Sequence, residues 1–81
     1  MSVATETRQG RALRLHDTDN VIVALETILP GAVTEGVAAV SRVPRGHKMA
    51  TAAIAQGEPI LKFGQIIGFA TQLIPPGEWV H

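Results

Sequence analysis

The sequence predicts an all-β fold of short strands, and the main reason is a turn phrase that occurs four times. In each phrase an aliphatic residue is followed three positions later by a glycine. The four copies are Ile28-Leu29-Pro30-Gly31, Val43-Pro44-Arg45-Gly46, Ile54-Ala55-Gln56-Gly57 and Ile74-Pro75-Pro76-Gly77. Proline presets the negative φ of a turn's first corner, and glycine accepts the positive φ that other residues resist. Four such reversals in 81 residues leave room only for short strands.

The first two strands are predicted from side-chain pattern and branching. Residues 12–16 alternate apolar and polar side chains, which predicts a short, half-exposed strand ending at His16. Residues 21–25 begin with three β-branched side chains, which lose rotamer freedom in a helix and therefore favour an extended chain. A helix capped by Asp19 is the alternative for this segment.

The later strands lie between the glycine turns. Extended segments are predicted at residues 32–34, 37–40, 48–54, 59–63 and 65–70. The segment 48–54 is rich in alanine, so a single helical turn is the alternative there, although its flanking turns favour a strand. The last two segments form the densest apolar stretch of the chain. Gly64 and Gly68 within this stretch predict a bulge or a close approach to the backbone.

The composition limits the chain to one small domain. A domain of this size buries only about 60% of the surface that its unfolded chain exposes, so its stability is marginal. The chain has no cysteine, so disulfides and thiolate metal sites are excluded. We therefore expect a partner subunit or a homo-oligomer. Residues 1–11 are polar and aperiodic and are predicted to form a flexible tail before a domain at residues 12–81.

Charge and hydropathy exclude two classes of partner. Seven basic residues balance seven acidic ones and are scattered, whereas a nucleic-acid binder needs clustered Lys and Arg. No apolar run reaches the roughly 20 residues of a membrane span, and the N-terminus lacks the order of a signal peptide. We expect a cytoplasmic protein that binds neither nucleic acid nor a membrane.

Five ordered blocks of sequence carry a family resemblance. They lie at residues 14–24, 44–48, 53–60, 62–68 and 76–81. Their order and spacing resemble the SAF domain of the altronate/galactarate dehydratase family. The resemblance implies a β-clip fold of short bent strands and hairpins. It also implies dehydration of a sugar acid to a 2-keto-3-deoxy acid with a divalent metal, which would be Fe²⁺, Mn²⁺ or Mg²⁺.

The resemblance also implies a partner chain. Members of this family occur as long single chains or as separate small and large subunits, and the length of this chain corresponds to the small one. The expected function is that of a small subunit whose active site a large catalytic subunit completes. Three alternatives stay open: the alpha subunit of a sulfolactate sulfo-lyase, a non-catalytic ligand-binding or adaptor module, and a purely structural unit.

Polar side chains at the predicted corners are the candidates for this chemistry. Elimination of water needs a base, an acid and positive charge near the developing enolate, so His47 and Lys48 are the predicted catalytic pair. Adjacent strand residues point to opposite faces, so the pair shares a site only if the turn twists them together. Arg45 and His81, the latter close to the sole tryptophan, are predicted to bind substrate. The alternative for each is an ordinary surface side chain.

The predicted metal ligands are His16 and Asp19. Together with Asp17 and Asn20 they form the densest cluster of hard ligands in the sequence. Carboxylate and carbonyl oxygens suit Mg²⁺ or Mn²⁺, and imidazole suits Fe²⁺ or Mn²⁺. The alternative is structural, because Asp and Asn at a turn often hydrogen-bond the backbone.

Overall fold

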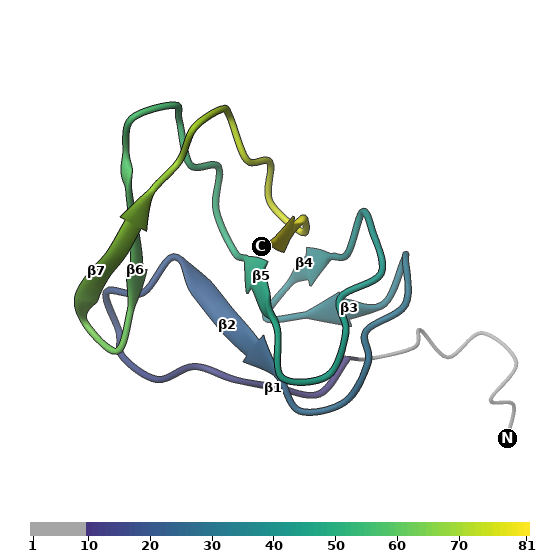
Figure 1. Ribbon diagram of the computed structural model, residues 1–81. Helices are drawn as coiled ribbons and strands as arrows, with labels where there is room; N and C mark the ends of the chain where they lie inside the picture. Colours follow the sequence, from purple (N-terminus) through teal and green to yellow (C-terminus); the bar gives the residue numbers. More distant parts are fainter. Residues whose placement is uncertain (1–9) are drawn as a thin grey trace, which may run out of the picture.

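Residues 10–81, which the computed structural model describes, fold into eight short strands (Figure 1). The strands are β1 (Ala12–Leu13), β2 (Val21–Ala24), β3 (Val33–Thr34), β4 (Val37–Ala38), β5 (Lys48–Ala50), β6 (Pro59–Lys62), β7 (Gln65–Phe69) and β8 (Trp79–Val80). The prediction of an all-β fold is confirmed. Residues 21–24 and 48–50 are strands, so the helical alternatives for these segments are wrong. No helix of residues 10–81 is long and apolar enough to cross a membrane.

Two residues of the predicted tail, Gly10 and Arg11, are hydrogen-bonded to the domain. The N–H of Gly10 donates to the carbonyl of Val33, and the carbonyl of Arg11 accepts from Leu25. Gly10 and Arg11 are therefore hydrogen-bonded to residues of the domain, although the prediction places both in the tail. The rest of the predicted tail, residues 1–9, lies outside the described residues.

A four-stranded antiparallel sheet forms the centre of the fold, in the order β1-β2-β5-β8. Two separate hairpins, β3-β4 and β6-β7, stand on either side of it (Figure 1). The register of the sheet aligns Ile22, Met49 and Trp79 in one row. It aligns Val23, Lys48 and Val80 in the adjacent row, so the side chains of the two rows face opposite sides of the sheet.

The four glycine turns form as the sequence predicts. Each glycine has a positive φ: 90° at Gly31, 82° at Gly46, 86° at Gly57 and 86° at Gly77. In every turn the residue after the glycine donates its N–H to the carbonyl three residues earlier, as Ala32 does to Leu29. A positive φ at the third turn position is the mark of a type II turn.

The turns belong to a longer repeat, because a buried alanine lies seven residues before each glycine. The repeated sets are Ala24-Ile28-Gly31, Ala39-Val43-Gly46, Ala50-Ile54-Gly57 and Ala70-Ile74-Gly77. Each glycine N–H donates, over 2.8 Å, to the carbonyl of the alanine in the partner set. The aliphatic residues pair as two isolated bridges, Ile28 with Val43 and Ile54 with Ile74.

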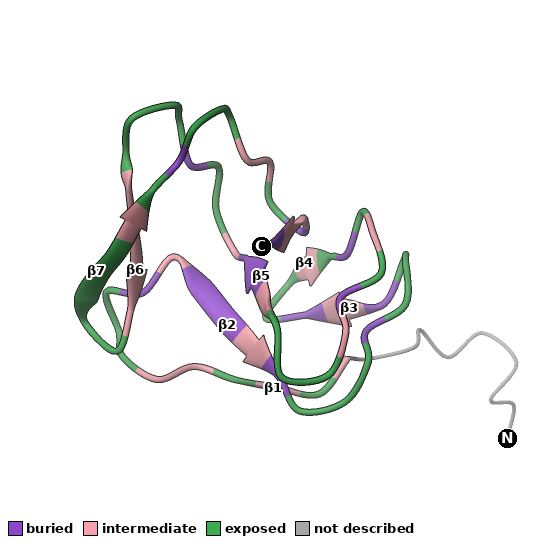
Figure 2. Ribbon diagram, viewed as in Figure 1, coloured by how far each residue is buried: buried purple, intermediate pink, exposed green. Residues whose placement is uncertain are grey.

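The repeat divides the domain into two similar units, residues 24–47 and 50–78, each with one hairpin between its two turn sets. The first unit packs on one face of the central sheet around Ile22 and Met49. The second packs on the other face around Val21 and Val80. Figure 2 shows the buried positions gathered along β2 and β5, between the two units.

Both hairpins close through two-residue turns with positive φ at both central residues, which is the type I′ geometry. These residues are Glu35 and Gly36 in the first unit, and Phe63 and Gly64 in the second. The predicted bulge is present, because the register shifts between Ile60 and Leu61. The predicted close approach is also present, since a Cβ on Gly64 would lie 3.0 Å from the His16 ring.

Candidate functional site

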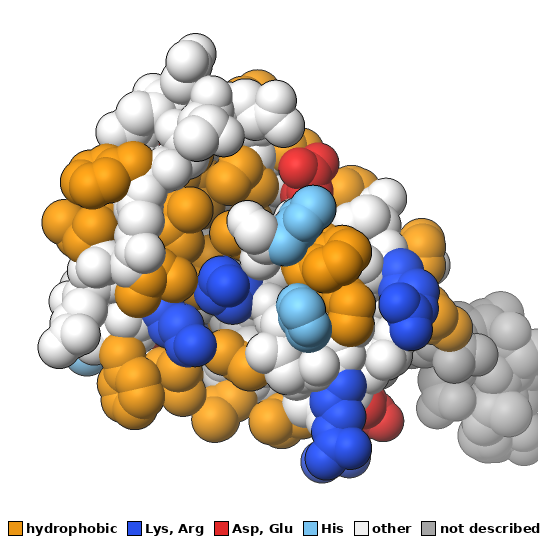
Figure 3. Space-filling view, in the orientation of Figure 1, with side chains coloured by type: hydrophobic (Ala, Val, Ile, Leu, Met, Phe, Trp, Pro, Cys, Tyr) orange, Lys and Arg blue, Asp and Glu red, His pale blue; other side chains and the backbone are white. Residues whose placement is uncertain are grey.

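The structure brings His47, Trp79 and His81 together as one aromatic cluster. The rings of His47 and Trp79 meet edge to face with centroids 5.3 Å apart. The rings of Trp79 and His81 are stacked, with centroids 4.3 Å apart and an interplanar angle of 23°. Both histidines are exposed and Trp79 is half-buried. Figure 3 shows two histidine side chains on either side of an apolar one, near the middle of this face.

Strand register explains why these three side chains meet. Met49 pairs with Trp79 across β5 and β8. His47 precedes Met49 by two residues and His81 follows Trp79 by two, so all four side chains lie on the same face of the sheet. The indole contacts the buried cluster of the first unit, and the hydroxyl of Ser41 accepts the backbone N–H of Trp79 at 3.2 Å.

A hydrogen bond orients the His47 imidazole. The indole Nε1–H of Trp79 donates to Nδ1 of His47 at 3.3 Å. Since the indole nitrogen is only a donor, Nδ1 is unprotonated in this arrangement, and the proton of the neutral ring lies on Nε2. Nε2 of His47 is therefore left to donate a hydrogen bond to a ligand.

The other two residues predicted at this corner lie apart from the cluster. Lys48 is half-buried and shares its row with Val23 and Val80, so the turn does not twist its side chain onto the face of His47. Arg45 is exposed at the corner of the Gly46 turn. His47 and Lys48 are therefore adjacent in the chain, but their side chains lie on opposite faces of the sheet.

Asp19, predicted as a metal ligand, supports the tip of the β6-β7 hairpin. It is only 6% exposed. Its two carboxylate oxygens accept the backbone N–H groups of Phe63 and Gly64, each at 2.8 Å. These are the donors that a type I′ turn leaves pointing outward, so the carboxylate satisfies both central residues of the turn.

The environment of Asp19 favours its ionised form. Burial is the strongest influence and acts to raise the pKa of its carboxyl group. The hydrogen bonds from Gly64 and Phe63, with smaller electrostatic contributions from His16 and Arg14, act to lower the pKa. Their sum outweighs burial, and the pKa of Asp19 lies below its ordinary value.

Asn20 and His16 complete this support. The Asn20 amide donates to the carbonyl of Pro59 at 3.0 Å and accepts the N–H of Leu61 at 2.8 Å, so it occupies the outer edge of β6. Nδ1 of His16 accepts the backbone N–H of Thr18 at 3.1 Å, and the ring lies against Gly64. The polar segment therefore bonds the backbone, mainly that of a hairpin about 40 residues away.

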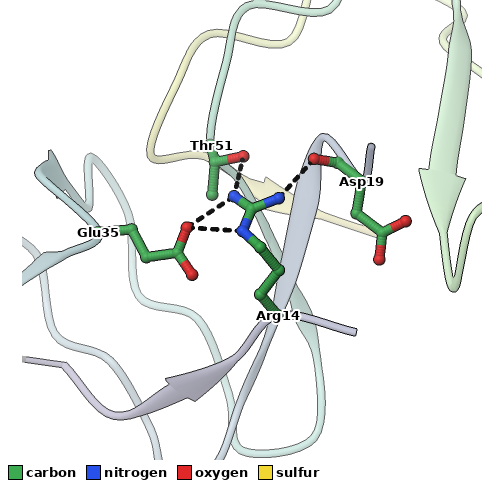
Figure 4. Close-up of polar contacts among 4 residues, drawn as sticks. All are labelled: Arg14, Asp19, Glu35 and Thr51. Atoms are coloured by element: carbon green, nitrogen blue, oxygen red, sulfur yellow. Dashed lines mark hydrogen bonds and ion pairs between the residues drawn. The ribbon is translucent and has the colours of Figure 1, made fainter. Parts of the chain in front are cut away.

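Arg14 is a residue whose role the sequence pattern missed. Its guanidinium donates to the carboxylate of Glu35 from Nε at 2.9 Å and from Nη2 at 2.6 Å (Figure 4). It also donates to the carbonyl of Asp19 at 2.7 Å and to the hydroxyl of Thr51 at 3.3 Å. The bond to Glu35 is the main cause of the raised pKa of Arg14. Arg14 therefore connects the turn of the first hairpin to the loop that supports the second.

His16 and Asp19 are not part of a set of metal ligands within residues 10–81. Both oxygens of Asp19 are engaged by backbone donors. Residues 10–81 contain no group of three or more His, Cys, Asp or Glu side chains placed to hold an ion. A ligand role for His16 and Asp19 stays a prediction, and it would require further ligands from outside the described residues.

Comparison with known proteins identifies what the chain resembles. Residues 10–81 match the family described as the altronate/galactarate dehydratase SAF domain. The chain is 31% identical to the galactarate dehydratase (L-threo-forming) of Escherichia coli (strain K12) over 83 aligned positions. It is 36% identical to the altronate dehydratase of Bacillus subtilis (strain 168) and 37% identical to that of Escherichia coli (strain K12), each over 73 positions.

These alignments cover most of this chain and little of the relatives. They include 99% of the chain for the galactarate dehydratase and 85% for the two altronate dehydratases. They include 16% of the first relative and 15% of each of the others. The chain therefore spans about one sixth of the length of the curated relatives that it matches, all of which are named as dehydratases.

Proposed function

Because the chain belongs to the altronate/galactarate dehydratase SAF domain family, we propose that it is the small component of a sugar-acid dehydratase. In this proposal a larger polypeptide completes the active site, and the complex removes water from a hydroxy acid to leave a 2-keto-3-deoxy acid. The names of the relatives support the reaction class, and their much greater length supports the need for a second polypeptide.

The observation that carries the proposal is the cluster of His47, Trp79 and His81. Two exposed imidazoles around one indole offer donors and acceptors at the surface, where a hydroxy acid bound by a second polypeptide can reach them. Nε2 of His47 is the group suited to donate a hydrogen bond to the leaving hydroxyl. His81 and Arg45 are proposed to bind the substrate, and Lys48 to add positive charge near the complex interface.

The proposal includes a divalent metal only because the family resemblance implies one. The described residues do not provide a full ligand set, so most ligands would come from the larger polypeptide. No step of the proposed chemistry assigned to this chain depends on the metal. His47 and His81 bind and orient the substrate through hydrogen bonds, and these roles need only their own ring nitrogens.

The proposal is tested by isolating the complex from its native host. A tagged chain is purified, co-purifying chains are identified by mass spectrometry, and the complex is assayed for 2-keto-3-deoxy acids. The substrates are a panel of aldonates, aldarates and sulfolactate, with Mg²⁺, Mn²⁺ or Fe²⁺ added. Release of a keto acid from a sugar acid supports the proposal. Release of sulfite alone indicates a sulfo-lyase, and binding without turnover indicates an adaptor module.

His47→Ala is expected to lower kcat of the complex by about 100-fold or more, because it removes the positioned donor. Trp79→Phe keeps an aromatic ring beside His81 but removes the donor to Nδ1. It is expected to lower kcat by about fivefold, the effect of one ordinary hydrogen bond, with little change in KM.

The two variants, His47→Ala and Trp79→Phe, are compared at equal occupancy of the complex. Full activity of His47→Ala would remove this residue from the site.

A further inference from the structure

The β6-β7 hairpin exposes large apolar side chains that the fold itself does not bury. We call Phe63, Ile66, Ile67 and Phe69 the β7 surface. Their exposed fractions are 65%, 57%, 48% and 61%. Figure 2 shows β7 exposed along nearly its whole length, and Figure 3 shows apolar side chains gathered over it. A solvent-facing strand ordinarily alternates apolar and polar residues, so a strand with large apolar groups on both faces indicates a contact surface.

The conformation of Phe63 strengthens this interpretation. Its φ is +62°, in a turn position where asparagine or aspartate is favoured and a bulky aromatic residue is strained. The corresponding residue of the first unit is Glu35, with φ of +51°, and its carboxylate bonds Arg14. The Phe63 ring is exposed instead of buried. A strained aromatic residue that adds nothing to the core points to a role outside the domain.

The hairpin is also held in a defined position. Asp19 bonds the two central N–H groups of the turn, and Asn20 occupies the outer edge of β6. Since the N–H of Leu61 points outward to Asn20, the opposite residue Ile66 directs its own N–H and carbonyl to the free edge of β7. The side of the hairpin that faces the domain is anchored, and the other side is presented to a partner.

The charge of this surface indicates the kind of partner. Residues 63–77 contain no acidic residue, no basic residue and no histidine. Edge strands that remain in solvent are normally protected by charged side chains, whereas apolar surfaces without charge are typical of permanent interfaces. In the relatives, this domain is joined to a polypeptide more than five times its length. In these three relatives the equivalent domain therefore coexists with a polypeptide of that kind.

We propose that the β7 surface is the site where this domain docks against the larger dehydratase polypeptide. The inference rests on the proposed function, because it names the surface that the complex uses. The Phe63 ring and the side chains of Ile66 and Phe69 insert into an apolar, uncharged surface of that polypeptide. The aromatic cluster of His47, Trp79 and His81 lies outside the β7 surface and remains available to the substrate.

The test is a competition for incorporation into the complex. The larger polypeptide that co-purifies with the wild-type chain is co-expressed with equal amounts of wild-type chain and one variant, and mass spectrometry gives their ratio in the isolated complex. Phe63→Asn relieves the strained turn, so its thermal midpoint should not fall below that of the wild type. Ile66→Thr is the second variant. Leu29→Thr, at a residue 45% exposed in a turn of the first unit, is the control.

Phe63→Asn and Ile66→Thr are each expected to be under-represented in the complex by about tenfold or more, since each removes apolar area from the interface. Leu29→Thr is expected to compete equally with the wild type. Equal incorporation of Phe63→Asn and Ile66→Thr would overturn the docking proposal and leave the proposed function intact. A wild-type chain that purifies without a dehydratase polypeptide overturns the proposed function as well. Sedimentation of that chain then shows whether a second copy covers the β7 surface, in a dimer that Phe63→Asn dissociates.

Discussion

Gly77→Ala is expected to lower the free energy of unfolding by about 3 kcal/mol, which lowers Tm by roughly 15 °C in a domain of this size. Two effects combine at this residue. Its φ of +86° is strained for any residue with a Cβ. A Cβ on Gly77 would also overlap the carbonyl oxygen of Ala38, which is backbone and cannot move away cheaply. The turn would have to shift, and the adjoining strand β8 carries Trp79.

The matched control is Gly31→Ala. Gly31 has nearly the same conformation, with φ of +90°, in an equivalent type II turn. A Cβ there meets no atom within 4 Å. Only the backbone strain remains, so we expect the free energy of unfolding to fall by about 1 kcal/mol. Thermal and urea denaturation of both variants measure the difference. Equal losses would mean that the packing of Gly77 against Ala38 does not restrict this turn.

Asp19→Ala is expected to lower the free energy of unfolding by a similar amount, about 3 kcal/mol. The substitution leaves the N–H groups of Phe63 and Gly64 without their acceptor in a part-buried position. An unpaired buried donor costs about 1–3 kcal/mol, and here there are two. Asp17→Ala removes an exposed carboxylate two residues away and is expected to change stability by less than about 0.5 kcal/mol.

The same carboxylate predicts a dependence of stability on pH. The pKa of Asp19 is lower in the folded chain than its ordinary value of 3.8. A group of this kind contributes stability above its unfolded pKa and loses it as the pH falls through the folded pKa. The wild-type chain should therefore lose stability as the pH falls below about 4, and the Asp19→Ala variant should lose less. If the free energies of unfolding of the two proteins fell in parallel as the pH is lowered, Asp19 would not be the source of this pH dependence.

The local turns of the fold were predictable, and their partners were not. Gly31 and Gly77 are recognisable because proline and glycine determine backbone angles within four residues. The alanine seven residues before each glycine is also visible in the sequence, but alanine has no local signal of its own. The carbonyl of each alanine accepts the N–H of a turn glycine in the other set of the same unit. This contact is known only once the pairing of the two sets is known.

The candidate site was predictable in part. His47 and His81 were identified from residue type and family resemblance, and the structure places both against Trp79. Lys48 was predicted beside His47, but strand alternation turns it to the other face. Arg14 bonds Glu35, which lies 21 residues away in the chain, so no local sequence pattern could have indicated this contact.

The exposed position of the densest apolar stretch also came from the structure. Residues 65–69 have the composition of a buried strand, yet four of the five are exposed. Hydrophobic pattern measures only the tendency of a segment to leave water. Whether the segment enters the domain core or a partner's surface depends on which other segments already fill the core, and here Val21, Ile54 and Val80 fill it.

The sequence by itself determined the all-β class, the four glycine turns, the small size of the core and the family. These properties follow from backbone preferences of single residues, from composition and from ordered sequence blocks. The tertiary structure alone decided that Asp19 supports a hairpin tip 45 residues away and that His47 meets Trp79, 32 residues away. Such contacts depend on strand register and on the packing of two units across one sheet, which no short stretch of sequence encodes.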